Sequence, residues 1–168
     1  MRSILILGGL IAMAGSAYAA SEKAITIGPW QIEASFTESD DFDRCVMSRT
    51  TEDGIETRVS RDKDGLALAM SSPRWKLDKG KKYDVEFAAG RVTWKSDVAA
   101  TSQAVRVALT EQKFNDALRT ADQLEVRGAG STIRVSLDKS AAALSRLDSC
   151  YETNIKAIET NPFVAPSP

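Results

Sequence analysis

The chain contains no histidine in its 168 residues. Histidine is the usual general base near neutral pH and the commonest metal ligand, so its absence excludes Ser-His and Cys-His catalytic pairs and most zinc sites. Glycine-rich phosphate loops and the Gly-x-Ser-x-Gly motif of serine hydrolases are missing as well. We therefore expect a protein that is not an enzyme, with no catalytic residue, no metal site and no cofactor.

A large excess of charge of either sign is also missing. The 22 lysines and arginines are balanced by 23 aspartates and glutamates, which gives a formal net charge of −1. Nucleic-acid-binding domains usually have a strong basic excess, so no nucleic-acid partner is expected. Hydrophobic residues make up 43% of the chain and charged residues 27%, proportions typical of a globular protein rather than a disordered one.

Long apolar runs are absent after the first residues of the chain. Arg2 precedes an apolar run over residues 4–14, and the small-x-small sequence Ala17-Tyr18-Ala19 follows. This pattern is typical of a secretory signal peptide, and the run is shorter than the roughly 20 residues that a membrane anchor needs. We predict a signal peptide over residues 1–19, a single β-rich domain over 20–160 and a flexible C-terminal tail over 161–168. The expected location is the bacterial periplasm or the exterior, with no transmembrane segment after cleavage.

Cysteine occurs twice, as Cys45 and Cys150. In an exported protein an even, small number of cysteines favours a disulfide, and two cysteines allow one intramolecular pairing. A metal site or a reactive thiol is the alternative, but two cysteines without histidine make a poor ligand set and the CxxC spacing is absent. We predict a structural disulfide that joins a C-terminal helix to the second strand.

Apolar and polar residues alternate along most of the chain, the period of half-buried β-strands. Asp-Gly pairs at residues 53–54 and 64–65 separate three such runs between residues 44 and 71, which predicts a three-strand antiparallel meander. Elsewhere the alternation predicts strands over residues 25–36, 83–87, 92–94, 104–109, 123–127 and 132–137.

The apolar period changes twice to that of a helix. Phe114, Ala117, Leu118 and Ala121 have the spacing of one helix face. A second helix, capped by Asp138 or Ser140, is predicted with an apolar face of Leu144, Leu147 and Tyr151 that continues to Ile155 and Ile158. The fold class is therefore mainly β with α+β character: an antiparallel β-sandwich or a partly closed barrel that carries two helices.

The three tryptophans are candidate binding residues. Trp30 and Trp94 lie on alternating strand faces, where core packing is expected. Trp75 follows a proline and stands among basic residues, so it is the best candidate for a partly exposed aromatic side chain. With Lys79, Lys81 and Lys82, and with Lys76 beside it, it predicts a small cationic and aromatic patch for an acidic partner. The alternative is a solvated basic turn.

The loop over residues 38–43 contains Asp40, Asp41 and Asp43. Such a cluster can bind a cation or supply carboxylates for acid–base chemistry, although calcium requires six to eight oxygen ligands in a defined cage. A solvated polar turn is the alternative, and the sequence leaves open whether the loop binds a cation.

Three segments resemble those of a known family: GPWQIEA near the start, WKLDKGKKYDVEF in the middle and STIRVSLDKSAAALSRLDSC near the end. Together they are similar to the invasion-associated locus B family of small exported alphaproteobacterial proteins. That family tends to have a cysteine soon after the Gly-x-Trp strand, whereas here none follows Trp30 until Cys45. The resemblance implies a β-rich periplasmic or outer-surface protein without known catalysis, linked to the envelope or to host contact. It assigns no functional residues.

These observations favour an exported, non-enzymatic protein that binds a protein or another envelope component. A periplasmic inhibitor or chaperone-like module that grips another protein through Trp75 and residues 79–82 is the first alternative. A histidine-free hydrolase that uses carboxylates of the 40–43 loop is the second.

Overall fold

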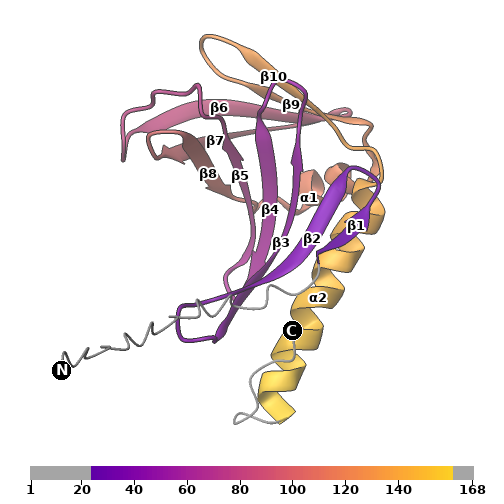
Figure 1. Ribbon diagram of the computed structural model, residues 1–168. Helices are drawn as coiled ribbons and strands as arrows, with labels where there is room; N and C mark the ends of the chain where they lie inside the picture. Colours follow the sequence, from indigo (N-terminus) through magenta and orange to yellow (C-terminus); the bar gives the residue numbers. More distant parts are fainter. Residues whose placement is uncertain (1–23, 161–168) are drawn as a thin grey trace, which may run out of the picture.

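The computed structural model describes residues 24–160, so the predicted signal peptide and C-terminal tail lie outside the described residues. It contains ten strands and two helices (Figure 1): β1 (Ile25–Ile27), β2 (Trp30–Phe36), β3 (Phe42–Thr50), β4 (Glu56–Asp62), β5 (Gly65–Ser71), β6 (Lys82–Ala89), β7 (Val92–Ala100), β8 (Ala104–Ala108), α1 (Gln112–Thr120), β9 (Gln123–Arg127), β10 (Thr132–Ser136) and α2 (Ser140–Thr160).

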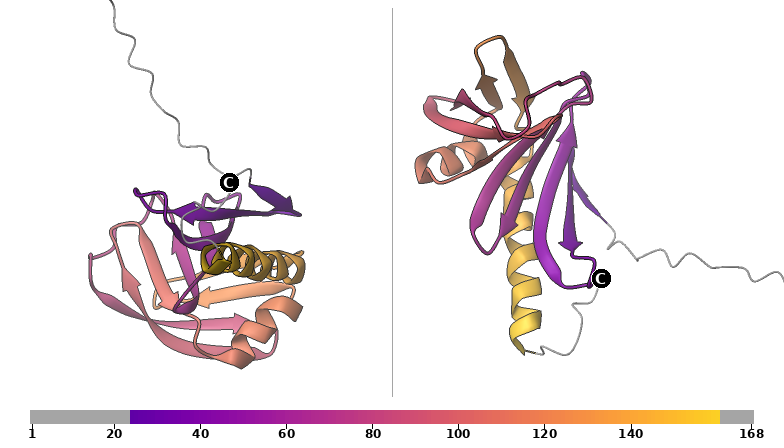
Figure 2. Two further views of the ribbon diagram at one scale, coloured as in Figure 1. Left: turned by 90° about the horizontal axis from the view of Figure 1, so that it is seen from below. Right: turned by 90° about the vertical axis from the view of Figure 1, so that its left-hand side faces the viewer.

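The strands form one open antiparallel sheet in the order β1-β2-β3-β4-β5-β8-β7-β6-β9-β10. The predicted fold class is confirmed, and the single curled, unclosed sheet is the partly closed form of the two expected arrangements. The predicted meander is also confirmed, as the antiparallel neighbours β3, β4 and β5. Figure 2 shows how strongly the sheet curls: seen from below, α2 lies inside its curve.

The inner face of the sheet carries the apolar side chains that the alternation predicts. They merge into one core with the apolar faces of both helices. Because successive strand residues point to opposite faces, the inner residues are apolar and their neighbours are mostly polar and exposed. The largest fully buried side chains are Trp30, Phe87, Phe114, Met47, Leu68, Met70, Leu124 and Leu147.

Two strand predictions were wrong in their bounds. The run over residues 25–36 is a hairpin of β1 and β2, because Gly28 has a φ of 57° and begins a tight turn with Pro29. Glycine adopts this left-handed conformation without steric cost, and proline fixes the next φ. The strand that starts at Val92 continues to Ala100, because alternation persists with Asp97 exposed and Val98 buried.

Strands from opposite sides of the curled sheet are joined by hydrogen bonds from side chains, not by backbone pairing between strands. The indole N–H of Trp30 on β2 donates to the carbonyl oxygen of Asp138 at 2.9 Å, and Arg49 on β3 donates to that of Ser136 at 2.5 Å. The Arg49 guanidinium also lies 5.4 Å from the Trp30 ring centroid, a cation–π contact. These contacts fasten Ser136, the last residue of β10, to β3, and Asp138, two residues further on, to β2.

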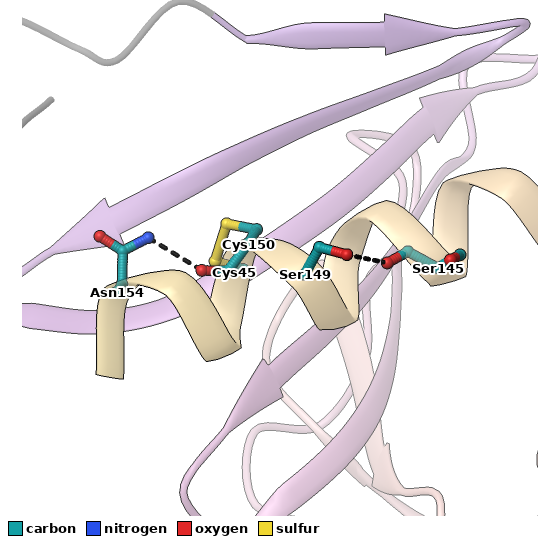
Figure 3. The surroundings of a disulfide bond; sticks show 5 residues. All are labelled: Cys45, Ser145, Ser149, Cys150 and Asn154. Carbon is teal, nitrogen blue, oxygen red and sulfur yellow. Dashed lines mark hydrogen bonds between the residues drawn. A yellow bond between two sulfur atoms is a disulfide. The ribbon is translucent and has the colours of Figure 1, made fainter. Parts of the chain in front are cut away.

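Helix α2 is held against the sheet by a covalent bond and by charge. Cys150 on α2 is bonded to Cys45 on β3, whose side chain is fully buried (Figure 3). The amide of the buried Asn154 donates to the carbonyl oxygen of Cys150 at 3.0 Å. Two residues before Cys150, Asp148 pairs with Arg119 of α1 at 2.7 Å and with Arg61 of β4 at 3.9 Å. The helix therefore contacts both α1 and the middle of the sheet.

Removing the disulfide should cost a large part of the stability. The bond spans 105 residues, and closing a loop of about 100 residues in the unfolded chain corresponds to about 4.7 kcal/mol in the chain-entropy description. We expect a Cys45→Ala, Cys150→Ala variant to lose about 3–5 kcal/mol in urea unfolding. Ser149→Ala, one residue away on the exposed side of α2, is the control and should change stability little. An equal loss in both variants would contradict this role.

Gly28→Ala should be more destabilising than Gly54→Ala. Both glycines have positive φ, 57° and 75°, so an alanine at either position is strained by about 1 kcal/mol. A Cβ at Gly28 would also lie 2.7 Å from Cγ of Lys139, whereas nothing lies within 4 Å of one at Gly54. We expect an extra loss of about 1–2 kcal/mol at Gly28, measured by thermal unfolding. Equal losses would show that Lys139 moves away without cost.

Candidate functional site

The inner face of the sheet has a cavity between the β9–β10 hairpin, the β3–β4 turn and the β5–β6 loop. The β9–β10 hairpin and the β3–β4 turn lie at the upper end in Figure 1, away from the last turn of α2. The cavity has a volume of about 600 Å³, within the usual range of ligand sites. We call it the mouth pocket. Its apolar walls are Ile55, Met70, Trp75, Leu77, Tyr83, Val85, Val98, Val105, Val126 and Ile133, and its polar lining is Thr51, Asp53, Gly128, Ser131, Thr132 and Arg134.

One wall of the mouth pocket is the loop between β5 and β6, residues 72–81. Its backbone is bonded to the β7–β8 turn: the N–H of Ser72 donates to Gln103, that of Leu77 to Ser102 and that of Gly80 to Ala100, at 2.8 to 3.0 Å. These bonds hold the loop although it has no regular secondary structure. The wall that contains Trp75 is therefore preformed.

Tyr83 connects this loop to the pocket. Its hydroxyl accepts a hydrogen bond from the backbone N–H of Asp78 at 3.2 Å. The ammonium of Lys81 lies 5.1 Å from the Tyr83 ring centroid and 3.5 Å from the Asp78 carboxylate. A positive charge is thus held next to an aromatic ring that lines the apolar cavity.

The structure brings together part of the predicted binding patch. Trp75 is half-buried and lines the mouth pocket. Lys81 does not line the pocket, but its ammonium lies over the ring of Tyr83, which does. Lys79 and Lys82 are exposed on the same segment but do not line the pocket. The patch remains a prediction as a binding site.

The other tryptophans pack as expected. Trp30 is 1% exposed in the core. Trp94 is half-buried and stacks on Phe87 with a centroid separation of 5.2 Å, with Phe114 at 5.5 Å. Neither lines the mouth pocket.

Sequence reasoning missed most of the pocket walls. Tyr83, Val85 and Ile133 lie within strands that the alternation predicts over residues 83–87 and 132–137, but nothing in that pattern marks them as pocket residues. Alternation gives the face of the sheet but not which part of that face the helices leave open. The sequence contains no signal for this, because the contacts of the helices arise only in the fold. Helix α2 contacts β2, β3, β4 and α1, helix α1 also contacts β6 and β7, and neither helix contributes to the pocket lining.

The outer face carries a row of alternating charges across four strands. Lys95 on β7 pairs with Glu86 on β6 at 3.6 Å, and Arg127 on β9 pairs with Glu86 at 2.6 Å and with Glu125 at 2.7 Å. Arg134 on β10 completes the row, 3.2 Å from Glu125. Hydrogen bonds from Arg127 lower the pKa of both glutamates, and the same bonds raise the pKa of Arg127. The row joins the β9–β10 hairpin to β6.

One pair on this face has like charge. Asp84 on β6 lies directly opposite Asp97 on β7, and both line a shallow polar groove. A hydrogen bond with Asp97 and its negative charge raise the pKa of Asp84 above the ordinary 3.8. Like charges directly opposite on neighbouring strands are destabilising.

The acidic loop is held by local bonds, among them backbone hydrogen bonds from Thr37 to Asp41 and from Asp40 to Thr37. Asp41 donates its N–H to the hydroxyl of Thr37 at 3.2 Å, and Asp43 is paired with Arg44 at 2.6 Å. Within residues 24–160, no group of three or more His, Cys, Asp or Glu side chains is placed to hold a metal ion.

No helix in this part of the chain is long and apolar enough to cross a membrane.

Comparison with solved structures finds a shared fold. The chain is similar to the crystal structure of invasion associated protein B from Bartonella henselae, with a TM-score of 0.59 and 18% sequence identity over 77% of this chain and 97% of that one. The resemblance seen in the sequence is thereby confirmed at the level of the fold. No family model matches the chain, and no curated protein matches it.

Replacing Asp97 with asparagine should stabilise the protein at neutral pH. The raised pKa of Asp84 means that the proton shared with Asp97 stabilises the fold below pH 3.8, and that this contribution is lost as the pH rises through the folded value. Asp97→Asn keeps a hydrogen-bonding partner and removes one charge. We expect a higher Tm at pH 7, with a gain that shrinks as the pH falls towards 4.

The control for this measurement is Asp122→Asn, which changes the net charge equally at an exposed position. A Tm gain of the same size in Asp122→Asn would assign the effect to net charge. A gain in Asp97→Asn that stays constant with pH would contradict the shared proton.

Proposed function

We propose that the chain is an exported, non-enzymatic binding protein of the bacterial envelope that takes an apolar part of a protein partner into the mouth pocket. The observation that carries this proposal is a preformed apolar cavity of about 600 Å³ with Trp75 and Tyr83 in its walls. Aromatic side chains in well-packed pockets are the common anchors of protein interfaces. The basic segment around Lys81 adds positive charge beside the opening.

Export is supported by two features. The first nineteen residues have the pattern of a signal peptide. The bond between Cys45 and Cys150 is of the kind that persists in oxidising compartments. We place the protein in the periplasm or on the outside of the cell. The similar protein from Bartonella henselae is described as invasion associated, and contact with a host component is the corresponding proposal for a surface location here.

The chemistry of the pocket lining favours binding over hydrolysis. Among its described lining residues Asp53 is the single carboxylate, whereas glycoside hydrolysis needs two across a cleft. The backbone carbonyl of Asp53 accepts a hydrogen bond from Arg74, which ties the β3–β4 turn to the β5–β6 loop. Two walls of the pocket are thereby joined to each other. An inhibitor or chaperone-like protein would use this same surface, and the identity of the partner distinguishes them.

Substitution of Trp75 tests the proposal. The oxidised protein is used to capture partners from an envelope extract, and the dissociation constant of a reproducible partner is then measured by calorimetry. We expect Trp75→Ala to weaken binding by about tenfold or more, since it removes an aromatic anchor. Lys81→Ala should weaken it about two- to fivefold, mainly at low salt, because its charge is exposed.

Lys113→Ala is the control for Lys81→Ala, because it removes an exposed positive charge on α1, outside the pocket lining. Thermal unfolding checks that Trp75→Ala remains folded. A partner whose affinity is unchanged by both test variants does not use the mouth pocket. Turnover of a cell-wall or glycan substrate by the purified protein would overturn the non-enzymatic assignment.

A further inference from the structure

The last strand of the sheet, β10, has one paired edge and one open edge. It pairs with β9 and ends the strand order. Two backbone bonds set the phase of this pairing: the N–H of Gly128 donates to Ser131, and that of Leu137 donates to Asp122. In an antiparallel pair, hydrogen-bonded residues alternate along each strand. Ile133 and Val135 therefore bond to β9, while the backbone groups of Thr132, Arg134 and Ser136 point away from it.

Of the backbone groups on the unpaired edge of β10, one at the Ser136 end accepts a hydrogen bond, and those at the Thr132 end do not pair with a described strand. The carbonyl oxygen of Ser136 accepts the hydrogen bond from Arg49. Within residues 24–160, the backbone N–H and C=O groups of Thr132 and Arg134 have no strand to pair with. Thr132, Ile133 and Arg134 also line the mouth pocket, opposite Thr51 and Ile55 of the β3–β4 region. A row of backbone donors and acceptors thus borders an apolar cavity.

The edge is also firmly held. The outer charge row fixes Arg134 to Glu125 and, through Arg127, to Glu86 on β6. Because the Arg134 side chain is engaged on the outer face, it does not cover the edge. Figure 2 shows the β9–β10 hairpin and the β3–β4 turn as separate points at this end of the molecule.

We propose that an extended segment of a partner protein adds to β10 as an eleventh strand, with its backbone bonded to Thr132 and Arg134. Side chains of an added strand point alternately to the two faces of the sheet. Every second side chain of the segment would then enter the mouth pocket, where Trp75 and Tyr83 receive apolar groups. This inference rests on the proposed function and states how the partner is bound.

Charge defines the partner further. The segment over residues 74–82 carries Arg74, Lys76, Lys79, Lys81 and Lys82 against one acid, Asp78. The partner segment should therefore combine alternating apolar residues with acidic residues next to them. Strand addition supplies affinity through the backbone, and the pocket selects the side chains.

The probe is a phage-displayed library of random twelve-residue linear peptides, panned against the oxidised, exported protein. We expect enrichment of peptides with alternating apolar residues and acidic flanks. A synthetic copy of the most enriched peptide is then titrated while amide hydrogen exchange is followed by NMR. The amides of Thr132 and Arg134 should gain at least tenfold protection, because they become hydrogen-bonded to the added strand.

Thr132→Pro is the decisive variant. Proline removes the outward N–H and leaves the bonds to β9, which are made by Ile133 and Val135. We expect at least a tenfold loss of peptide affinity in Thr132→Pro and less than a twofold loss in Thr132→Ala, which removes the same side chain but keeps the N–H. Hydrogen exchange on the unmodified protein decides the question if Thr132→Pro does not fold.

Each other outcome overturns strand addition. Peptides that bind without protection of Thr132 and Arg134, and equally well to both variants, would leave the mouth pocket as a binding site and reject β10. No enriched peptide would reject the peptide mode, while the capture experiment with Trp75→Ala separately tests the pocket. Protection of both amides without peptide would assign the edge to a second copy if it depends on protein concentration, and to residues 161–168 if it disappears on their deletion.

Discussion

The structure depends on α2 being held inside the curl of the sheet. A ten-stranded sheet with one apolar face must bury that face, and residues 24–160 supply two helices with which to do so. The disulfide to Cys45 and the ion pairs of Asp148 fix α2 over β2, β3 and β4, next to α1. Both helices are thereby committed to one end of the inner face. The mouth pocket is the part of that face which they leave uncovered.

An uncovered apolar cavity requires walls that do not collapse into it. Here the walls are set by backbone bonds and charges outside the cavity. The β5–β6 loop is bonded to the β7–β8 turn, Arg74 joins that loop to the β3–β4 turn, and the outer charge row holds the β9–β10 hairpin. A pocket that is preformed in this way loses less conformational entropy when a partner binds.

Alternation of apolar residues was enough to predict the mainly β class, the meander of β3 to β5 and the strand that contains Tyr83 and Val85. It could not predict the pocket, because its position depends on how far each helix reaches across the curled sheet. The hairpin at Gly28 was missed although the sequence contains a signal for it: Ile25 and Ile27 stand at odd positions and Trp30 and Ile32 at even ones, so the alternation changes phase at Gly28 and Pro29. The disulfide pairing followed from export and cysteine number, which are independent of geometry.

The sheet does not close into a barrel, and residues at both ends of β10 explain why no strand within residues 24–160 pairs with its free edge. Where β10 ends, Arg49 donates a hydrogen bond to the carbonyl oxygen of Ser136, which a closing strand would otherwise take, and Trp30 donates one to the carbonyl oxygen of Asp138 just after the strand. At the upper end the β3–β4 turn contains Gly54 and two acids, residues that do not extend a strand towards β10. Open sheet edges are usually blocked by charge, proline or a covering segment. An edge left open beside an apolar cavity, on a hairpin fixed from its outer face, has the features expected of a surface that receives another strand.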